Sequence, residues 1–229
     1  MLVPIPYDNF RYIYPPRPEN RVHRDAVSGY EGRGFVAQPK LNGDCMLVFT
    51  NGKEVRTYNR HKQTFAKKIL HADTFGQLHR QSIVDEERKW MCLVGEYMIK
   101  SKKDASGRPW NDKFVIFDIL VYDGVQLIGS TVSERIALLD LLYGTQDLSL
   151  TGDGVAHHGV LFSTSVKDVF RVKSYPSFFG KLYDDITKID MFEGLVLKQS
   201  NAKLENGARE FNNSSWQIKI RKETKNYTY

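Results

Sequence analysis

The sequence predicts an α+β fold built on antiparallel sheets with helices packed against them. Strand-like runs rich in Val, Ile, Phe and Tyr recur along the chain, and several follow one another without an intervening helix. An Asn-Gly pair at 51–52 joins two of them as a hairpin. Of the 229 residues, 41% are hydrophobic and 26% are charged, which is the composition of a globular protein. This composition excludes a disordered, collagen-like or disulfide-stapled chain.

The first 34 residues are expected to form an extended N-terminal arm. They are rich in Pro, Arg and Tyr, and Pro15, Pro16 and Pro18 exclude a regular helix across that stretch. The pattern changes after Gly34, and we expect one domain from 35 to 229.

Strands and helices follow in order along this domain. The apolar run 46–49 and the alternation at Val55 and Tyr58 predict the two strands of the hairpin. Apolar residues among polar ones over 63–89 predict an amphipathic helix with a break near Gly76. Further strands are expected at 91–99, 114–123, 159–164, 194–200 and 215–221.

Two more helices are predicted from their ends. One covers 134–143, with Ser133 as its N-cap and Gly144 at its end. The other has Pro176 in its first turn. Its inward positions would be Phe179, Leu182, Ile186 and Ile189.

Several function classes are disfavoured. No run approaches 18 apolar residues, and the N-terminus lacks a basic segment followed by an apolar one, so we expect no membrane span and no secretory signal. Cys45 and Cys92 form no CxxC motif, and the six histidines show no metal-ligand spacing. We therefore expect a cytoplasmic monomer with reduced thiols.

Charge is segregated along the chain, within a formal net charge of +6. Two basic segments, 51–103 and 198–229, bracket an acidic one, 104–197. Such a pattern suits a polyanionic partner, although charged runs are also ordinary solvated surface, so the motifs must decide.

Short motifs follow one another in a characteristic order. They are PKLNG (39–43), YNRH (58–61), VGEY (94–97), IFDIL (116–120), FEGLVLK (192–198) and WQIKIRK (216–222). Each is weak alone, but the ordered series resembles the motifs of the covalent nucleotidyltransferase superfamily, which contains ATP-dependent DNA ligases, RNA ligases and mRNA capping guanylyltransferases. The resemblance covers 35–222 and implies a ligase-type, ATP-grasp-like nucleotidyltransferase (adenylation) domain.

The resemblance implies roles for the first motifs. Lys40 matches the lysine that attacks the nucleotide α-phosphate to give a lysyl-nucleotide, which requires a neutral amine. Gly43 would let the backbone approach the nucleotide. Arg60 matches an arginine that contacts the nucleotide or a 5′-phosphate. The alternatives are a surface lysine before a turn and a solvated arginine.

The central motifs imply the nucleoside contacts. Glu96 matches a carboxylate that binds the ribose hydroxyl, Phe117 an aromatic that stacks on the purine, and Asp118 the adjacent carboxylate. For Phe117 the alternative is a core residue, because Val115, Phe117 and Ile119 alternate and one face of the strand must be buried.

The last motifs imply metal and phosphate binding. Glu193 matches the acid that holds the catalytic metal, and its hard oxygen ligands favour Mg²⁺ or Mn²⁺. The usual Lys-x-Lys is present as Lys219 and Arg221. Lys198 is a further phosphate candidate on its strand, whereas Lys222 should point to the other face.

Departures from the family patterns bear on the substrate. Many DNA ligases have Asp at the position of Asn42 and Arg at that of Cys45, and K-x-N-G occurs among RNA ligases. The stretch 116–142, in contrast, resembles the DNA-ligase version. The chain stops seven residues after Lys222, leaving no room for the OB-fold domain that usually follows, so we expect a minimal enzyme or a piece cut at a domain boundary.

The combined expectation is an ATP-dependent polynucleotide ligase that seals 5′-phosphate/3′-hydroxyl nicks in a duplex through a lysyl-AMP intermediate, with DNA slightly favoured over RNA. An RNA ligase, a capping guanylyltransferase that uses GTP, and an inactive nucleic-acid-binding module stay open as alternatives. The joint presence of Lys40, Glu96, Glu193 and Lys219 argues against inactivity.

Overall fold

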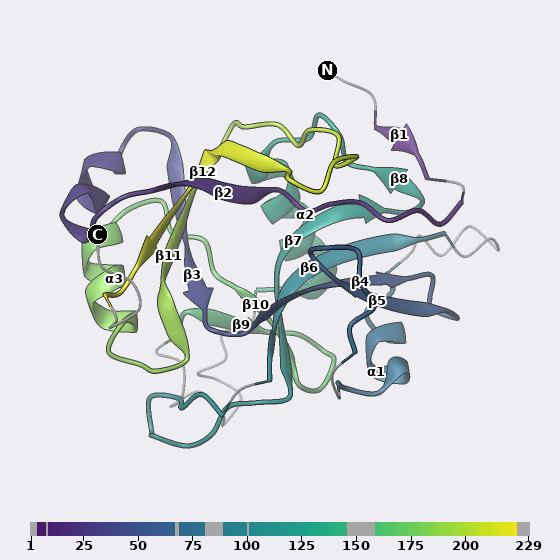
Figure 1. Ribbon diagram of the computed structural model, residues 1–229, viewed down its shortest axis with the longest axis horizontal. Helices are drawn as coiled ribbons and strands as arrows, with labels where there is room; N and C mark the ends of the chain where they lie inside the picture. The colour runs from purple at the N-terminus through teal and green to yellow at the C-terminus, as the bar shows by residue number, and fades with distance from the viewer. Residues whose placement is uncertain are drawn as a thin grey trace.

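Two β-sheets form the framework of the computed structural model (Figure 1), which describes residues 4–7, 9–66, 69–80, 89–99, 101–145 and 159–223. The larger sheet contains β1 (Ile5–Pro6), β4 (Asp44–Thr50), β5 (Val55–Asn59), β6 (Met91–Met98), β7 (Lys113–Tyr122), β8 (Val125–Gln126), β9 (Leu161–Ser163) and β10 (Val169–Val172). The smaller sheet contains β2 (Arg17–Arg21), β3 (Phe35–Leu41), β11 (Phe192–Gln199) and β12 (Asn213–Arg221). The helices are the 3-10 helix η1 (Arg24–Tyr30), α1 (Ala72–Gly76), α2 (Val132–Tyr143) and α3 (Phe179–Ile186).

Antiparallel pairing dominates both sheets, which confirms the expected α+β class. The larger sheet has the order β1-β8-β7-β6-β4-β5, and the smaller one β2-β12-β11-β3. Two pairs are parallel, β10 with β7 and β12 with β2, and neither was expected because the partners lie far apart in the sequence. The predicted hairpin is present as β4 and β5.

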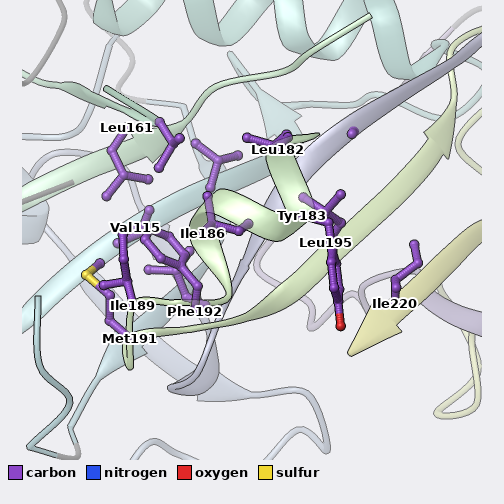
Figure 2. Close-up of a cluster of buried hydrophobic side chains, with 14 of the residues drawn as sticks. Val115, Leu161, Leu182, Tyr183, Ile186, Ile189, Met191, Phe192, Leu195 and Ile220 are labelled. Atoms are coloured by element: carbon purple, nitrogen blue, oxygen red, sulfur yellow. The ribbon is translucent and has the colours of Figure 1, made fainter. Parts of the chain in front are cut away.

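The core beside the smaller sheet fixes the position of β11 (Figure 2). Helix α3 buries Leu182 and Ile186 in the same cluster as Phe192 and Leu195 of β11 and Ile220 of β12. Burying an aliphatic or aromatic side chain contributes about 1.5–3 kcal/mol. The apolar face of the small sheet is thus packed, and its opposite face is left for other contacts.

Helix α2 begins earlier than predicted. Its N-cap is Thr131, not Ser133, because Thr131 and Glu134 form a capping box. The Thr131 hydroxyl accepts from the Glu134 N–H, and the Glu134 carboxylate accepts from the Thr131 N–H at 2.7 Å. The end at Gly144 is as predicted, with φ 73°.

The helix predicted over 63–89 is wrong for most of its described part. Only α1 is helical, and Thr64 pairs with Tyr58 in a β-bridge instead. The Leu70 N–H donates to the hydroxyl of Tyr97 at 2.9 Å, so tertiary contacts replace the helical hydrogen bonds. Residues 67–68 and 81–88 of this prediction lie outside the described residues.

Helix α3 starts at Phe179, three residues beyond the predicted Pro176. The preceding residue, Phe178, has φ 60°, a left-handed conformation that interrupts any earlier turn. The carboxylate of Glu31 accepts from the N–H groups of Phe178 and Phe179 at 3.1 and 2.8 Å, which caps the helix from the N-terminal arm.

The arm is not extended throughout. Strand β2 runs beside β12, and residues 24–30 form η1, whose Arg24 forms an ion pair with Asp184 of α3. The arm is therefore an integral part of the smaller sheet. None of the helices in the described ranges has the length and apolar character that a bilayer crossing requires.

Candidate active site

A cavity of about 430 Å³ lies on the face of the smaller sheet opposite α3. One side is formed by β2, β3, β11 and β12, and the other by side chains from β4, β6, β7 and the turn after β5. The sequence-predicted residues that line it are Lys40, Arg60, Glu96, Phe117, Lys198, Lys219 and Arg221. Glu193 is bonded to Lys40 at its edge, whereas Gly43 and Asp118 do not line it.

Lys40 and Glu193 form the centre of the site. The ammonium of Lys40 lies 2.5 Å from the Glu193 carboxylate, and the Arg221 guanidinium lies 3.2 Å from the same oxygen. With its amide oriented so that both ends are satisfied, Asn42 donates to the other Glu193 oxygen at 3.2 Å and accepts from Lys102 at 3.1 Å. Each Glu193 oxygen therefore has a partner, and the carboxylate is held beside the lysine.

A bulge in β11 puts Glu193 in this position. The register between β11 and β3 shifts between Phe192 and Gly194, and Gly194 pairs with Lys40. Gly194 has φ 146°, and a Cβ there would lie 2.0 Å from the Ile220 carbonyl oxygen. Only glycine fits, which explains Glu-Gly in the motif.

Glu96 of β6 lies beside the central pair. Its carboxylate accepts from the Gly43 N–H at 3.1 Å. Burial raises the pKa of Glu96 to about 7, an increase that Lys40 partly offsets and Glu193 reinforces. A Cβ at Gly43 would lie 2.5 Å from the Tyr97 carbonyl oxygen and 2.9 Å from the Glu96 Cγ, so Gly43 acts by admitting this carboxylate.

Phe117 and Lys198 form the wall across from β3. The Lys198 ammonium donates to the Phe117 carbonyl at 3.1 Å and lies 5.4 Å from the centre of its ring. Lys198 is 4% exposed, and burial lowers its pKa to about 8, opposed by Asp118, with Arg135 adding to the decrease. The half-buried Phe117 ring faces the cavity, which also has Val196 in its wall.

Asp118 lies behind that wall, away from the cavity lining. Two nitrogens of Arg135 from α2 lie 2.8 and 3.3 Å from its oxygens, and the Ile119 N–H donates to it at 2.9 Å. Burial would raise its pKa, but Arg135 and Lys198 outweigh this and hold the pKa below its usual range. Its connection to the cavity is through Lys198, 3.9 Å away.

Cations concentrate on β12 and β2. Lys219 donates to the Pro18 carbonyl at 3.2 Å, and its pKa is lowered by burial and then by Arg21, Arg221 and Arg17. Lys222 points elsewhere, as predicted, and donates to the carbonyl of Ile189.

Sequence reasoning missed Gln38 and the arm residues from Pro15 to Arg21, which also line the cavity. Gln38 is 3% exposed and donates to the Ser174 hydroxyl at 3.0 Å, while its carbonyl oxygen has no hydrogen-bond partner among the described residues. Its position two residues before Lys40 on one strand could have indicated it. The arginines of the arm, among them Arg17 and Arg21, predict only a general phosphate-binding surface, because their place at this cavity depends on the pairing of β2 with β12.

The carboxylates that could hold a divalent cation are Glu193 and Glu96. Within the ranges that the structure describes, no cluster of three or more His, Cys, Asp or Glu side chains is present, while His157 and His158 lie outside those ranges. Two carboxylates suit Mg²⁺ or Mn²⁺ if phosphate oxygens and water complete the coordination shell.

Cys45 and Cys92 are both free thiols.

Comparison with known proteins gives the family. Solved structures that match include "mycobacterial DNA ligase D complexed with ATP and MES" and the ligase domain of M. tuberculosis LigD, each with TM-score 0.56, 18% identity and 93% of this chain covered. The chain spans 62% and 61% of those two chains. A comparison with curated proteins gave no match.

At this identity the structural matches show a common fold. The family description "ATP dependent DNA ligase domain" matches residues 20–219, most of the chain. The matched range contains every motif residue from Lys40 to Lys219. The chain therefore belongs to the ATP-dependent DNA ligase domain family, within the covalent nucleotidyltransferase superfamily.

Proposed function

We propose that this chain carries out the adenylyl transfer of a DNA ligase, with Lys40 as the nucleophile. The observation that carries the proposal is the 2.5 Å contact between Lys40 and Glu193 beside Arg221, at the edge of a cavity with an aromatic wall and several cations. This combination suits a nucleoside triphosphate, because cations bind its phosphates and an aromatic ring stacks on its base.

In the first step, the Lys40 amine attacks the α-phosphate of ATP. Lys40 first releases one ammonium proton to water, because only the neutral amine is a nucleophile. The N–P bond then forms, the P–O bond to the β-phosphate breaks, pyrophosphate leaves with the electron pair, and the nitrogen gives its second proton to water. Lys219, Arg221 and Arg60 stabilise the charge on the phosphates. A Mg²⁺ held by Glu193, with Glu96 nearby, would add charge neutralisation when bound.

The walls of the cavity support adenine as the base. Phe117 and Val196 would enclose the ring, and Glu96 would accept from a ribose hydroxyl. The carbonyl oxygen of buried Gln38, which has no hydrogen-bond partner within the described ranges, can accept from the amino group of adenine, whereas guanine presents an oxygen acceptor at that position. An acceptor facing an acceptor is unfavourable, and this favours ATP over GTP.

The later steps concern the polynucleotide. AMP passes from Lys40 to a 5′-phosphate, and a 3′-hydroxyl then displaces AMP and closes the nick. Membership of the DNA ligase domain family and the net positive charge support a nicked DNA duplex as the substrate. RNA is the second candidate, supported by Asn42 in the K-x-N-G motif.

The decisive experiment is incubation of the protein with each α-³²P-labelled NTP and Mg²⁺, followed by a denaturing gel. We expect an adduct with ATP that is absent in Lys40→Ala and retained in the matched control Lys53→Ala, an exposed loop lysine. An adduct that persists in Lys40→Ala would refute the site. Labelling by GTP alone would favour a capping enzyme.

The substrate is tested by sealing four nicked duplexes that differ only in the sugars beside the nick. We expect the fastest sealing with deoxyribose on both sides, and activity confined to a 3′-terminal ribose would contradict the DNA preference. Binding to a nicked duplex should weaken about 10³-fold between 50 and 200 mM salt if about six phosphates are contacted.

A further inference from the structure

The N-terminal arm contributes charged side chains to the nucleotide cavity. Arg17, Glu19 and Arg21 alternate along β2 and all line the cavity. This face exists because β2 pairs in parallel with β12, with Arg21 opposite Lys219. The arm is thus part of the wall that surrounds Lys40.

The pairing of Arg21 with Lys219 is unfavourable without a ligand. Like charges opposite each other on neighbouring strands destabilise a sheet. In the part of the chain that the structure describes, no carboxylate forms an ion pair with either residue, and the Lys219 ammonium donates instead to the Pro18 carbonyl. The repulsion would be relieved by an anion between them.

The order of residues across the sheet indicates which anion. Gln38, Val196, Lys219 and Arg21 form one row, from β3 through β11 and β12 to β2. Three strand spacings make this row about 14 Å long. With the base near Gln38 and the α-phosphate at Lys40, the remaining phosphates can extend across β12 towards β2.

We propose that Arg21, assisted by Arg17, binds the β- and γ-phosphates of the nucleoside triphosphate and the pyrophosphate that leaves. The proposal rests on the proposed function of Lys40. Arg17 is already oriented at the cavity edge, because it donates to the Asn213 side chain at 2.6 Å and its guanidinium lies 5.2 Å from the centre of the Phe211 ring. Arginine suits this task because its planar group binds phosphate oxygens in pairs.

The test compares Arg21→Gln with the matched control Arg33→Gln, an exposed arm arginine outside the cavity. Pre-adenylated protein is incubated with increasing pyrophosphate, and reversal to ATP is followed. We expect the half-saturating pyrophosphate concentration to rise about tenfold in Arg21→Gln, which corresponds to about 1.4 kcal/mol, because the variant loses a charge-assisted hydrogen bond to phosphate. Arg33→Gln should match the wild type, and Arg21→Lys should recover part of the loss.

Two further measurements separate the outcomes. Transfer of AMP from pre-adenylated protein to a nicked duplex should be unchanged in Arg21→Gln. A defect in that transfer, with normal response to pyrophosphate, would overturn the proposal and place a nucleic-acid phosphate at Arg21. If the wild type forms no adduct, the proposed function fails, and calorimetric titration with pyrophosphate still decides whether Arg21 binds it.

Discussion

Two groups of charged side chains lie on either side of Phe117, and they are satisfied in different ways. Behind the ring, Asp118 and Arg135 are both buried, and two nitrogens of the Arg135 guanidinium donate to the two carboxylate oxygens of Asp118. In front of it, on the cavity wall, Lys219 and Arg21 are neighbours without a carboxylate partner among the described residues. The charges of the first group neutralise each other within the protein, whereas the cations of the second group are available to bind an anion.

We expect this difference to separate residues that stabilise the fold from residues that bind a ligand. Buried charges must be paired, because an unpaired one would be destabilising. Cations around a cavity can remain unpaired, since water or an incoming anion solvates them. Substitutions in the first group should therefore change the free energy of unfolding, and those in the second should change adduct formation.

The largest expected effect on stability is that of Asp118→Ala. It leaves the Arg135 guanidinium buried without its carboxylate and should reduce the free energy of unfolding by about 3–5 kcal/mol. Urea unfolding followed by circular dichroism measures this, with exposed Asp25→Ala as the control. A loss below about 1 kcal/mol would contradict the structural role of the pair.

Glu193→Gln should have the opposite profile. Removing the carboxylate charge beside Lys40 should slow adduct formation by about 10²–10³, the range for a preorganised electrostatic group. The free energy of unfolding, measured by urea titration, should stay within about 1 kcal/mol of the wild type, because the Glu193 side chain is 24% exposed and water can replace a lost hydrogen bond. Exposed Glu205→Gln is the matched control, and equal adduct rates in the two variants would refute the role of Glu193.

Glu96 provides a test through pH. Its folded-state pKa of about 7 exceeds the ordinary value of 4.5, so the folded protein retains a proton that the unfolded chain releases. The stabilisation is complete below pH 4.5 and is lost as the pH rises through 7. The stability of the wild type relative to Glu96→Gln should fall by about 1–3 kcal/mol over that interval, measured as urea midpoints at a series of pH values. Parallel pH profiles would contradict the burial of an ionisable carboxyl here.

Local patterns in the sequence were sufficient for the elements that local interactions form. The Asn-Gly hairpin and the Gly144 helix end require only neighbouring residues. The order of the motifs was sufficient to predict that Lys40, Glu96 and Glu193 lie close together, because the resemblance extends over most of the chain. The helix predicted over 63–89 was wrong because the contact between Leu70 and Tyr97 outweighs helical periodicity.

The pairing of strands that lie far apart in the chain could not be predicted from local sequence patterns. Strand β2 lines the cavity only because it pairs with β12, almost 200 positions later. For Phe117, the alternation of apolar residues favoured a core position and the motif favoured a stacking position. The structure has register shifts between β6 and β7, and Phe117 is half-buried between a fully buried Ile116 and Asp118. Alternation therefore fails on this strand, and a ring that contacts the core can also face the cavity.

The smallest predicted effect distinguishes these two roles of Phe117. Phe117→Leu should raise the KM for ATP in adduct formation about tenfold, because the stacking of a base on an aromatic ring contributes about 1–3 kcal/mol. Its kcat and stability should change little, since Leu retains much of the contact with the core. The matched control is Phe114→Leu on the same strand. Phe114 is 0% exposed, and the centre of its ring lies 5.8 Å from that of Phe75. That variant should lose stability, by about 1–3 kcal/mol, and keep its KM. If Phe117→Leu instead destabilises the protein as strongly as Phe114→Leu and leaves KM unchanged, Phe117 is a core residue and another group must hold the base.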